Sequence, residues 1–144
     1  MPPLIRAATA SDLEAICALL ETAGLPTADL RRARPTFLVA AAGAELAGAG
    51  ALEIHAETAL LRSLVVAPAW RGRGLGHLLV RSLERQARAA RVHQLVVLTQ
   101  TATAFFTRLD YQVIERTQAP AAVQASQEFV ALCPASATCL GKRL

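Results

Sequence analysis

The residues with the clearest chemical meaning form a short glycine-rich stretch, Arg71-Gly-Arg-Gly-Leu-Gly76. Glycine lets a backbone turn sharply and approach a ligand closely. A helix that begins at such a loop points unpaired N–H groups and the positive end of its dipole at whatever the loop holds. Arg71 and Arg73 add full positive charges. The stretch therefore predicts an anion site that suits a phosphate or pyrophosphate.

A second group of candidate residues surrounds Arg62, which interrupts the apolar strand expected over residues 59–66. A buried strand does not carry an arginine without a reason. The guanidinium could clamp a carboxylate, phosphonate or arsonate, or it could form a structural ion pair with an acid such as Glu53, and both interpretations stay open. Because side chains alternate along a strand, one of Arg62 and Ser63 should line a cleft and the other the opposite face.

Three classes of phosphate ligand could use the glycine-rich loop. A P-loop requires a lysine after its last glycine, but here Gly76 is followed by His77, and the only lysine is Lys142. A dinucleotide-binding motif follows the first strand of a domain and needs an acid about 20 residues later. This loop lies in mid-chain and lacks that acid. The pyrophosphate of coenzyme A is the third class, and it has neither requirement.

Hydrophobic periodicity surrounds the loop with a strand, a helix and a further strand. The helix over 76–91 has an apolar face formed by Leu75, Leu79, Leu83, Ala87 and Ala90, with Leu78 beside it, and polar residues opposite, including a Glu84–Arg88 pair. The strands over 59–66 and 94–99 should then be parallel. Thr99 and Gln100 would line a cleft at the same edge. The other expected strands are 4–8, 37–42, 45–54, 111–116 and 137–143, and the other helices are 11–24, 27–34, 104–109 and 120–132.

The element order predicts one α/β domain, residues 1–144, with a mixed sheet flanked by helices. The sequence lacks an apolar run long enough to cross a membrane and a signal-peptide pattern, so we expect a cytoplasmic protein with no membrane partner. Its net charge of +4 suits an anionic small ligand, and its scarcity of aromatic residues argues against nucleic acid. The cysteines, Cys17, Cys133 and Cys139, are interpreted as packing residues, since their spacing fits no structural zinc site.

Three features together resemble the GNAT acetyltransferase superfamily. Arg71-x-x-Gly74-x-Gly76 matches the family motif Gln/Arg-x-x-Gly-x-Gly/Ala, Leu64-Val-Val66 stands where the family has its signature strand, and Phe105-Phe-x-x-x-x-Tyr111 where it has an aromatic segment. The resemblance covers essentially the whole chain. It implies a mostly antiparallel sheet with a central parallel pair. Residues 59–66 and 126–137 look more narrowly like N-acetyltransferases encoded in arsenic-resistance operons, and they also resemble short homologues of amino-acid N-acetyltransferases.

The resemblance also assigns roles to individual residues. It implies acetyl-CoA as cosubstrate, no metal, and a small-molecule amine as acceptor, and it is compatible with a homodimer. Backbone groups of Leu64, Val65 and Val66 would hold the pantetheine and the acetyl group. Phe106 would pack against the pantetheine, although it occupies the position of a tyrosine that usually reprotonates the thiolate. The pyrophosphate would be bound by the loop and the residue after it: Arg71, Gly72, Arg73, Gly74, Leu75, Gly76 and His77.

The acceptor side is less strongly specified. An ammonium group must lose a proton before it attacks a thioester, and the candidate bases are Glu53, which we favour, His55 and Glu57. Arg62, Ser63 and Thr99 are the predicted substrate-binding residues. The acceptor would be an amino acid or an amine-bearing arsenical, and Cys133 and Cys139 could hold trivalent arsenic. The alternative is a non-catalytic CoA-binding sensor, which the missing tyrosine would suit.

Overall fold

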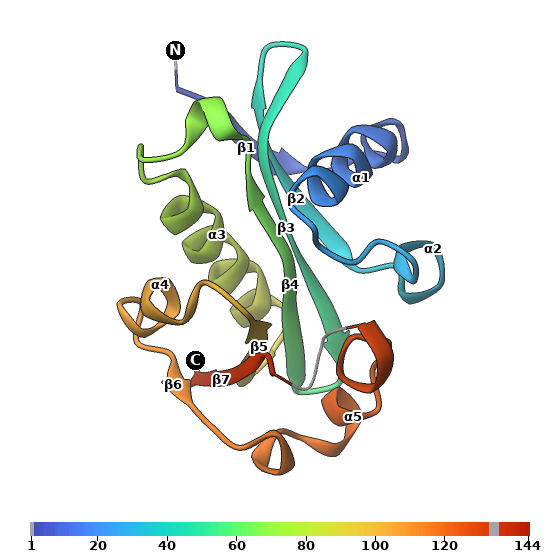
Figure 1. The fold of residues 1–144 in the computed structure, drawn as a ribbon, viewed down its shortest axis with the longest axis vertical. Helices are drawn as coiled ribbons and strands as arrows, with labels where there is room; N and C mark the ends of the chain where they lie inside the picture. Colours follow the sequence, from blue (N-terminus) through green and yellow to red (C-terminus); the bar gives the residue numbers. More distant parts are fainter. Residues whose placement is uncertain (1, 133–135) are drawn as a thin grey trace.

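The computed structural model describes residues 2–132 and 136–144, which form a seven-stranded sheet in the order β1-β2-β3-β4-β5-β7-β6 (Figure 1). Every strand pair is antiparallel except β4–β5. The strands are β1 (Leu4–Ala7), β2 (Thr36–Ala42), β3 (Glu45–His55), β4 (Thr58–Val66), β5 (Gln94–Thr99), β6 (Gln112–Val113) and β7 (Thr138–Arg143). The helices are α1 (Leu13–Thr22), α2 (Leu30–Ala33), α3 (Leu75–Ala89), α4 (Thr103–Thr107) and α5 (Ala121–Gln124), with short turns η1 (Ala10–Asp12), η2 (Pro68–Trp70), η3 (Arg116–Gln118) and η4 (Glu128–Leu132). The mixed α/β fold with one parallel pair is as predicted.

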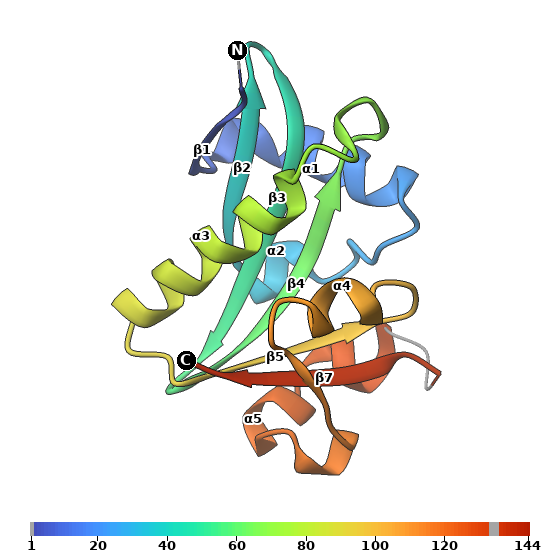
Figure 2. The same cartoon turned by 90° about the vertical axis from the view of Figure 1, so that its left-hand side faces the viewer.

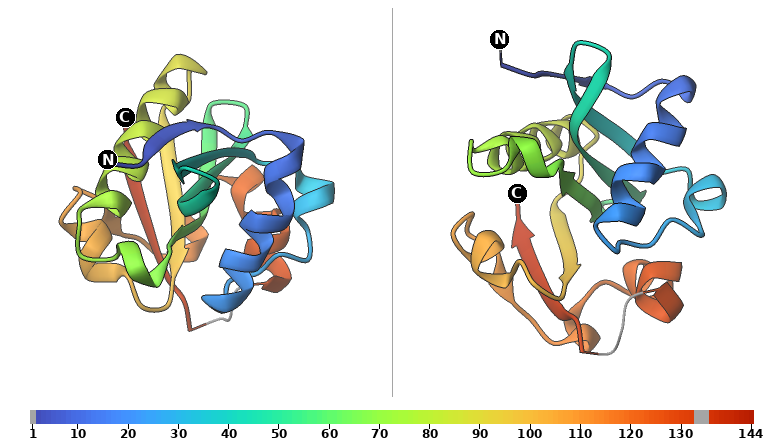
Figure 3. Two further views of the ribbon diagram at one scale, coloured as in Figure 1. Left: turned by 90° about the horizontal axis from the view of Figure 1, so that it is seen from above. Right: turned by 45° about the horizontal axis from the view of Figure 1, so that its top comes forward.

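Helices cover both faces of the sheet (Figures 2 and 3). On one face, α3 and α4 pack on Leu52, Leu61 and Val97. On the other face, α1 and α2 pack on β2 and β3, while α5 and η4 pack on Leu60 and Val96. The sheet therefore lies at the centre of the domain. None of the helices in the described part of the chain is long and apolar enough to cross a membrane.

The parallel pair β4–β5 is short. Residues Thr58–Leu60 pair with Gln94–Val96, and within the described residues no pairing continues beyond that point. The remainder of β4 and the end of β5 then form the two walls of a cleft. Along this edge of β4, backbone N–H and C=O groups have no partner strand among the described residues, as at any open strand edge. The Val66 carbonyl accepts a hydrogen bond from Arg71 Nε instead (3.2 Å).

A β-bulge lies in the middle of β4. Ala49 and Ala51 of β3 pair with Val65 and Arg62, so two residues of β4, Ser63 and Leu64, stand opposite the single Gly50. Ser63 has φ of 57°, in the left-handed region that favours glycine. The extra residue reverses the alternation of side chains. After the bulge, Leu64 packs toward α3 and Val65 toward α1.

Two glycines of β3 let the bulge and α3 lie close to the sheet. A Cβ atom on Gly48 would lie 2.8 Å from the carbonyl oxygen of Val65, and one on Gly50 would lie 2.8 Å from Leu83 of α3. Real Cβ atoms do not approach other atoms that closely. The small residues of β3 are therefore required by close approach, which explains why a buried strand contains residues of low strand propensity.

The C-terminal part of the chain differs from the sequence prediction. The helix predicted over 120–132 is divided into α5 and the π-helical turn η4. The division falls at Ser126, whose hydroxyl accepts a hydrogen bond from the Phe129 N–H (3.4 Å) and starts a new turn. The strand predicted over 111–116 is only β6, because the Glu115 N–H bonds to the Gln118 side chain (2.8 Å) and η3 begins there.

Helix α3 carries a buried charge that its periodicity does not predict. Glu84 was expected on the exposed face with Arg88, but it is fully buried and accepts hydrogen bonds from Tyr111 Oη (2.9 Å) and Lys142 Nζ (3.0 Å). Burial opposes ionisation of Glu84, but those two hydrogen bonds outweigh it and lower its pKa below the ordinary value. The predicted apolar residue Leu78 is instead 55% exposed.

Removal of the Lys142 charge should destabilise the fold. In Lys142→Met the apolar stem is kept, but the Glu84 carboxylate loses its ammonium partner, so we expect a loss of about 2 kcal/mol at pH 7 by urea denaturation. Because the pKa of Glu84 is lowered on folding, its contribution is present at neutral pH, and the difference should narrow as the pH falls below about 4. The exposed Arg85→Met on the same helix is the control. Equal losses for both variants would contradict this account.

Candidate functional site

A cleft of about 560 Å³ opens where β4 and β5 separate. Its walls are the second half of β4, the end of β5 with the start of α4, and the connection between α1 and α2. Glu128 of η4 closes the cleft on the remaining side. The cleft thus lies at the carboxyl end of the parallel pair, where open α/β sheets bind their ligands.

The glycine-rich loop lies directly above β4 and leads into α3. Gly72 and Gly74 have φ of 77° and 78°, a conformation that residues with side chains rarely adopt. The Leu78 N–H bonds to the Gly74 carbonyl (3.1 Å), so the N–H groups of residues 75–77 precede the first hydrogen bond of this helix. These groups and the dipole of α3 have the arrangement that the sequence prediction of an anion site requires, and they form the candidate anion site.

The two arginines of the loop are exposed and frame this anion site. Arg71 Nε donates a hydrogen bond to the carbonyl of Val66 (3.2 Å), which fixes its stem against the end of β4. The Arg73 guanidinium lies 4.9 Å from the centre of the Trp70 ring. Both guanidinium groups thus lie near the loop amides. Within the described residues, neither of them forms an ion pair.

A buried charge cluster lies at one end of the cleft, around Arg62. Arg62 Nη1 contacts Asp29 Oδ2 (2.6 Å) and Glu53 Oε1 (2.9 Å), and Nη2 contacts Asp29 Oδ1 (2.7 Å). Glu53 Oε2 in turn lies 2.6 Å from Nε2 of His55. The structure therefore contains the Arg62–Glu53 ion pair, and Asp29 is a second partner 33 residues away in the sequence.

Arg62 keeps its charge in this environment. Burial alone would lower its pKa, but the hydrogen bond with Asp29 and the negative charge of Glu128 raise the pKa above its ordinary value. An arginine has five N–H donors, and Asp29 and Glu53 use three of them. Nε is buried and has no hydrogen-bond partner among the described residues. Nε–H and one N–H of Nη2 form a second edge that could bind an oxyanion.

The alternation predicted for residues 62 and 63 is wrong, because both line the same cleft. The bulge at Ser63 is the reason, since a residue in the left-handed region does not project to the face opposite its neighbour. The other expected lining residues Leu64, Val65, Val66, Thr99 and Phe106 do border the cleft. Thr99 Oγ1 accepts a hydrogen bond from the Ala102 N–H (3.0 Å) and so fixes the turn into α4.

Glu53 and His55 do not border this cleft, and Glu128 does. Glu53 lies behind Arg62, at 6% exposure. Sequence analysis singled out neither Asp29 nor Glu128. Asp29 belongs to a short segment that looks like a solvated helix, and Glu128 to a stretch whose helical pattern is broken. Tyr111, the only tyrosine, is hydrogen-bonded to Glu84 and does not border the cleft.

The two cysteines that the structure describes, Cys17 and Cys139, pack against apolar residues. Cys139 is buried among Leu60, Val96 and Phe129, and burial raises the pKa of its thiol to about 11. Cys17 packs beside the core under α1. Cys133 lies outside the described residues, so the predicted pair cannot be placed. The described residues contain no group of three or more His, Cys, Asp and Glu side chains that could hold a metal.

The chain belongs to the acetyltransferase (GNAT) family, because the model of that family matches residues 7–111. The sequence has no significant match among curated proteins. Among solved structures, Rv2747 from Mycobacterium tuberculosis, in complex with CoA and NLQ, is 27% identical over 99% of both chains, with a TM-score of 0.83.

Two further structures share the fold at lower identity. N-acetylglutamate synthase from Neisseria gonorrhoeae, complexed with coenzyme A and N-acetyl-glutamate, is 22% identical with a TM-score of 0.83; the match covers 98% of this chain but 35% of the synthase. A Klebsiella pneumoniae protein described as a putative acyl-CoA N-acyltransferase is 23% identical over 99% and 97% of the two chains, with a TM-score of 0.75. At these identities the likeness shows the fold alone.

The strained conformation of Ser63 gives a test of the bulge. Ser63→Gly should raise the free energy of unfolding by about 0.5–1 kcal/mol, because glycine adopts positive φ without strain. Ser82→Gly in the middle of α3 is the control and should lower it by about 0.5 kcal/mol. Both are measured by urea denaturation. A loss of stability in Ser63→Gly comparable with that in Ser82→Gly would show that residue 63 is not strained.

Proposed function

We propose that this protein transfers the acetyl group of acetyl-CoA to the α-amine of a small amino acid. Three features of the chain would hold the donor. The amides at the start of α3 and Arg71 and Arg73 suit the pyrophosphate, and the open edge of β4 at 64–66 suits the amide groups of pantetheine. CoA in the related Rv2747 structure supports this assignment. The thioester would then lie beside the bulge, next to Arg62.

The observation that carries the acceptor assignment is the charge distribution around Arg62. Its Nε–Nη2 edge offers two parallel donors, the geometry that binds a carboxylate. Three carboxylates, Asp29, Glu53 and Glu128, lie near this guanidinium, and carboxylates bind ammonium groups. An amino acid carries both of the groups that this surface suits. Its carboxylate fits the free edge of Arg62, and its ammonium group fits beside the carboxylate that borders the cleft, Glu128.

The reaction requires that the ammonium group lose a proton before attack. Glu128 is the carboxylate that borders the cleft, and we infer that it accepts this proton, directly or through water. Glu53 would instead hold Arg62 in position, with His55 behind it. The neutral amine then attacks the thioester carbonyl, the N–C bond forms, and the C–S bond breaks. With Tyr111 engaged elsewhere, water is the proton source for the departing thiolate.

The carboxylate of the acceptor should determine its affinity. We expect alanine to have a KM at least tenfold below that of alaninamide, measured by release of free CoA thiol and confirmed by mass spectrometry of the N-acetyl product. Arg62→Lys keeps the positive charge but removes the two-donor edge, so it should abolish most of this difference. An amine-bearing arsonate combines the same two charges and belongs in the same screen. Equal KM values for the acid and the amide would refute the role of Arg62.

The two carboxylates should have separable effects. Glu128→Gln should lower kcat for alanine by at least about a hundredfold at pH 7, and activity should recover as the pH rises toward 9 and the amine loses its proton unaided. Glu53→Gln should chiefly raise the KM for alanine, because it loosens Arg62. An aromatic amine, neutral at pH 7, is the control substrate. The opposite pattern would identify Glu53 as the base, as the sequence suggests.

The pH dependence of activity in these variants also reflects the charged groups around Glu128. Arg62 of β4, Asp29 before α2 and Glu53 of β3 all act within the same cluster, and His55 contacts Glu53. A pH effect that arises elsewhere in this cluster would appear in both variants alike. Recovery at high pH in Glu128→Gln alone therefore separates a base from a general electrostatic effect.

A further inference from the structure

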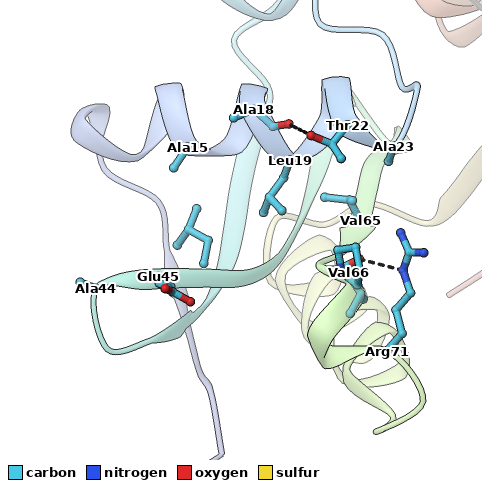
Figure 4. Close-up of a pocket in the computed structure, with 12 residues that line it drawn as sticks. Ala15, Ala18, Leu19, Thr22, Ala23, Ala44, Glu45, Val65, Val66 and Arg71 are labelled. Carbon is cyan, nitrogen blue, oxygen red and sulfur yellow. Dashed lines mark hydrogen bonds between the residues drawn. The ribbon is translucent and has the colours of Figure 1, made fainter.

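A second hollow of about 370 Å³ lies between α1 and the turn that joins β2 to β3 (Figure 4). Its floor is the end of β4 at Val65 and Val66. We call it the α1 groove. Its lining consists of Ala15, Ala18, Leu19, Thr22 and Ala23 from α1 and its C-terminal end, Ala44, Glu45 and Leu46 from the hairpin, and Val65, Val66, Pro68 and Arg71.

The α1 groove is lined mainly by small or apolar side chains. The face of α1 that borders it carries alanines at positions 15 and 18, both exposed, so the helix leaves room that larger residues would fill. Charged side chains occur only at its rim, where Glu45 stands on the hairpin and Arg71 on the loop. Arg71 is held there by its hydrogen bond to the Val66 carbonyl (3.2 Å). The groove therefore suits an uncharged apolar group.

The groove is continuous with the cleft described above. Ala23, Val65, Val66 and Arg71 border both hollows. The shared wall includes the C-terminal end of α1, which bounds the acceptor side of the cleft. A group that enters the groove can thus belong to a molecule whose amine and carboxylate lie beside Arg62. A cavity of this size is within the range of small-ligand sites.

We propose that the α1 groove is a second acceptor subsite, which binds the apolar side chain of the amino acid that is acetylated. This inference rests on the proposed function and specifies its substrate class. Amino acids with extended aliphatic side chains, such as leucine, should be preferred to alanine, because each additional buried methylene group favours binding. The expected preference in kcat/KM is roughly ten- to hundredfold, since discrimination by a hydrophobic pocket is limited.

A leucine placed in the groove tests the proposal. Ala18→Leu adds bulk at an exposed position of α1, and leucine forms helices nearly as well as alanine, so the fold should be retained. Ala89→Leu makes the same change at an exposed position of α3 that borders neither hollow. Release of CoA thiol is measured for both variants and wild type with leucine, with alanine, and over a range of acetyl-CoA concentrations.

We expect Ala18→Leu to lower kcat/KM for leucine by at least tenfold and to change the value for alanine and the KM for acetyl-CoA by less than twofold. Ala89→Leu should change none of them. Three results would overturn the proposal: no effect on leucine, an equal effect on alanine and leucine, or a raised KM for acetyl-CoA. The last would mean that the donor occupies the groove.

Direct binding separates failure of this inference from failure of the proposed function. If the wild type acetylates no amino acid, the proposed function fails. Calorimetry with N-acetylleucine and N-acetylalanine on the CoA-loaded protein then decides the subsite independently. Tighter binding of N-acetylleucine that is lost in Ala18→Leu supports an apolar subsite. Equal binding of both compounds, or none, overturns it.

Discussion

The early separation of β4 from β5 is the constraint on which the rest of the structure depends. The two strands pair over three residues, and everything that defines the site lies beyond that point. If β4 and β5 stayed paired, their backbone hydrogen bonds would occupy the space of the cleft. The bulge at Ser63 and Leu64 lies just beyond the last residue of β4 paired with β5, Leu60, and Gly50 gives the extra residue space. The bulge leaves Ser63 in a strained backbone conformation. The free-energy cost of that strain is small in a domain stabilised by burial on both faces of its sheet.

The sequence predicts features that depend on local pattern. The loop from Arg71 to Gly76 and the start of α3 follow from glycine conformation and helix periodicity, so they are found where expected. The charge cluster does not follow from any local pattern, since Asp29 and Arg62 are 33 residues apart in the sequence and meet only in the folded chain. The prediction that Glu84 is exposed is wrong for the same reason, because its partners, Tyr111 and Lys142, come from distant segments. A single inserted residue, as at Ser63, reverses side-chain alternation without a signal in composition.

The two buried charge networks are alike in chemistry but differ in their surroundings. Around Glu84, one carboxylate is matched by Lys142 and Tyr111, with Arg81 at 3.2 Å, and the network is closed. Around Arg62, Nε is buried with no hydrogen-bond partner among the described residues, so one donor edge is unused. A buried network that satisfies all its members adds rigidity, whereas one that lacks partners incurs a free-energy cost. A ligand can remove that cost by supplying the missing partner. We therefore interpret the network around Arg62 as a binding site and the network around Glu84 as structural support.

The glycines of β3 have a consequence for how this domain tolerates change. Beneath α3, positions 48 and 50 carry no side chain, so Leu79 and Leu83 rest against backbone and against the β4 residues that flank the bulge. The spacing between the glycine-rich loop and β4 is therefore set by close contact with the main chain. Substitutions elsewhere in the core can alter packing without moving the loop relative to the strand. Such an arrangement leaves the far walls of the cleft free to accept substitutions while the loop keeps its place.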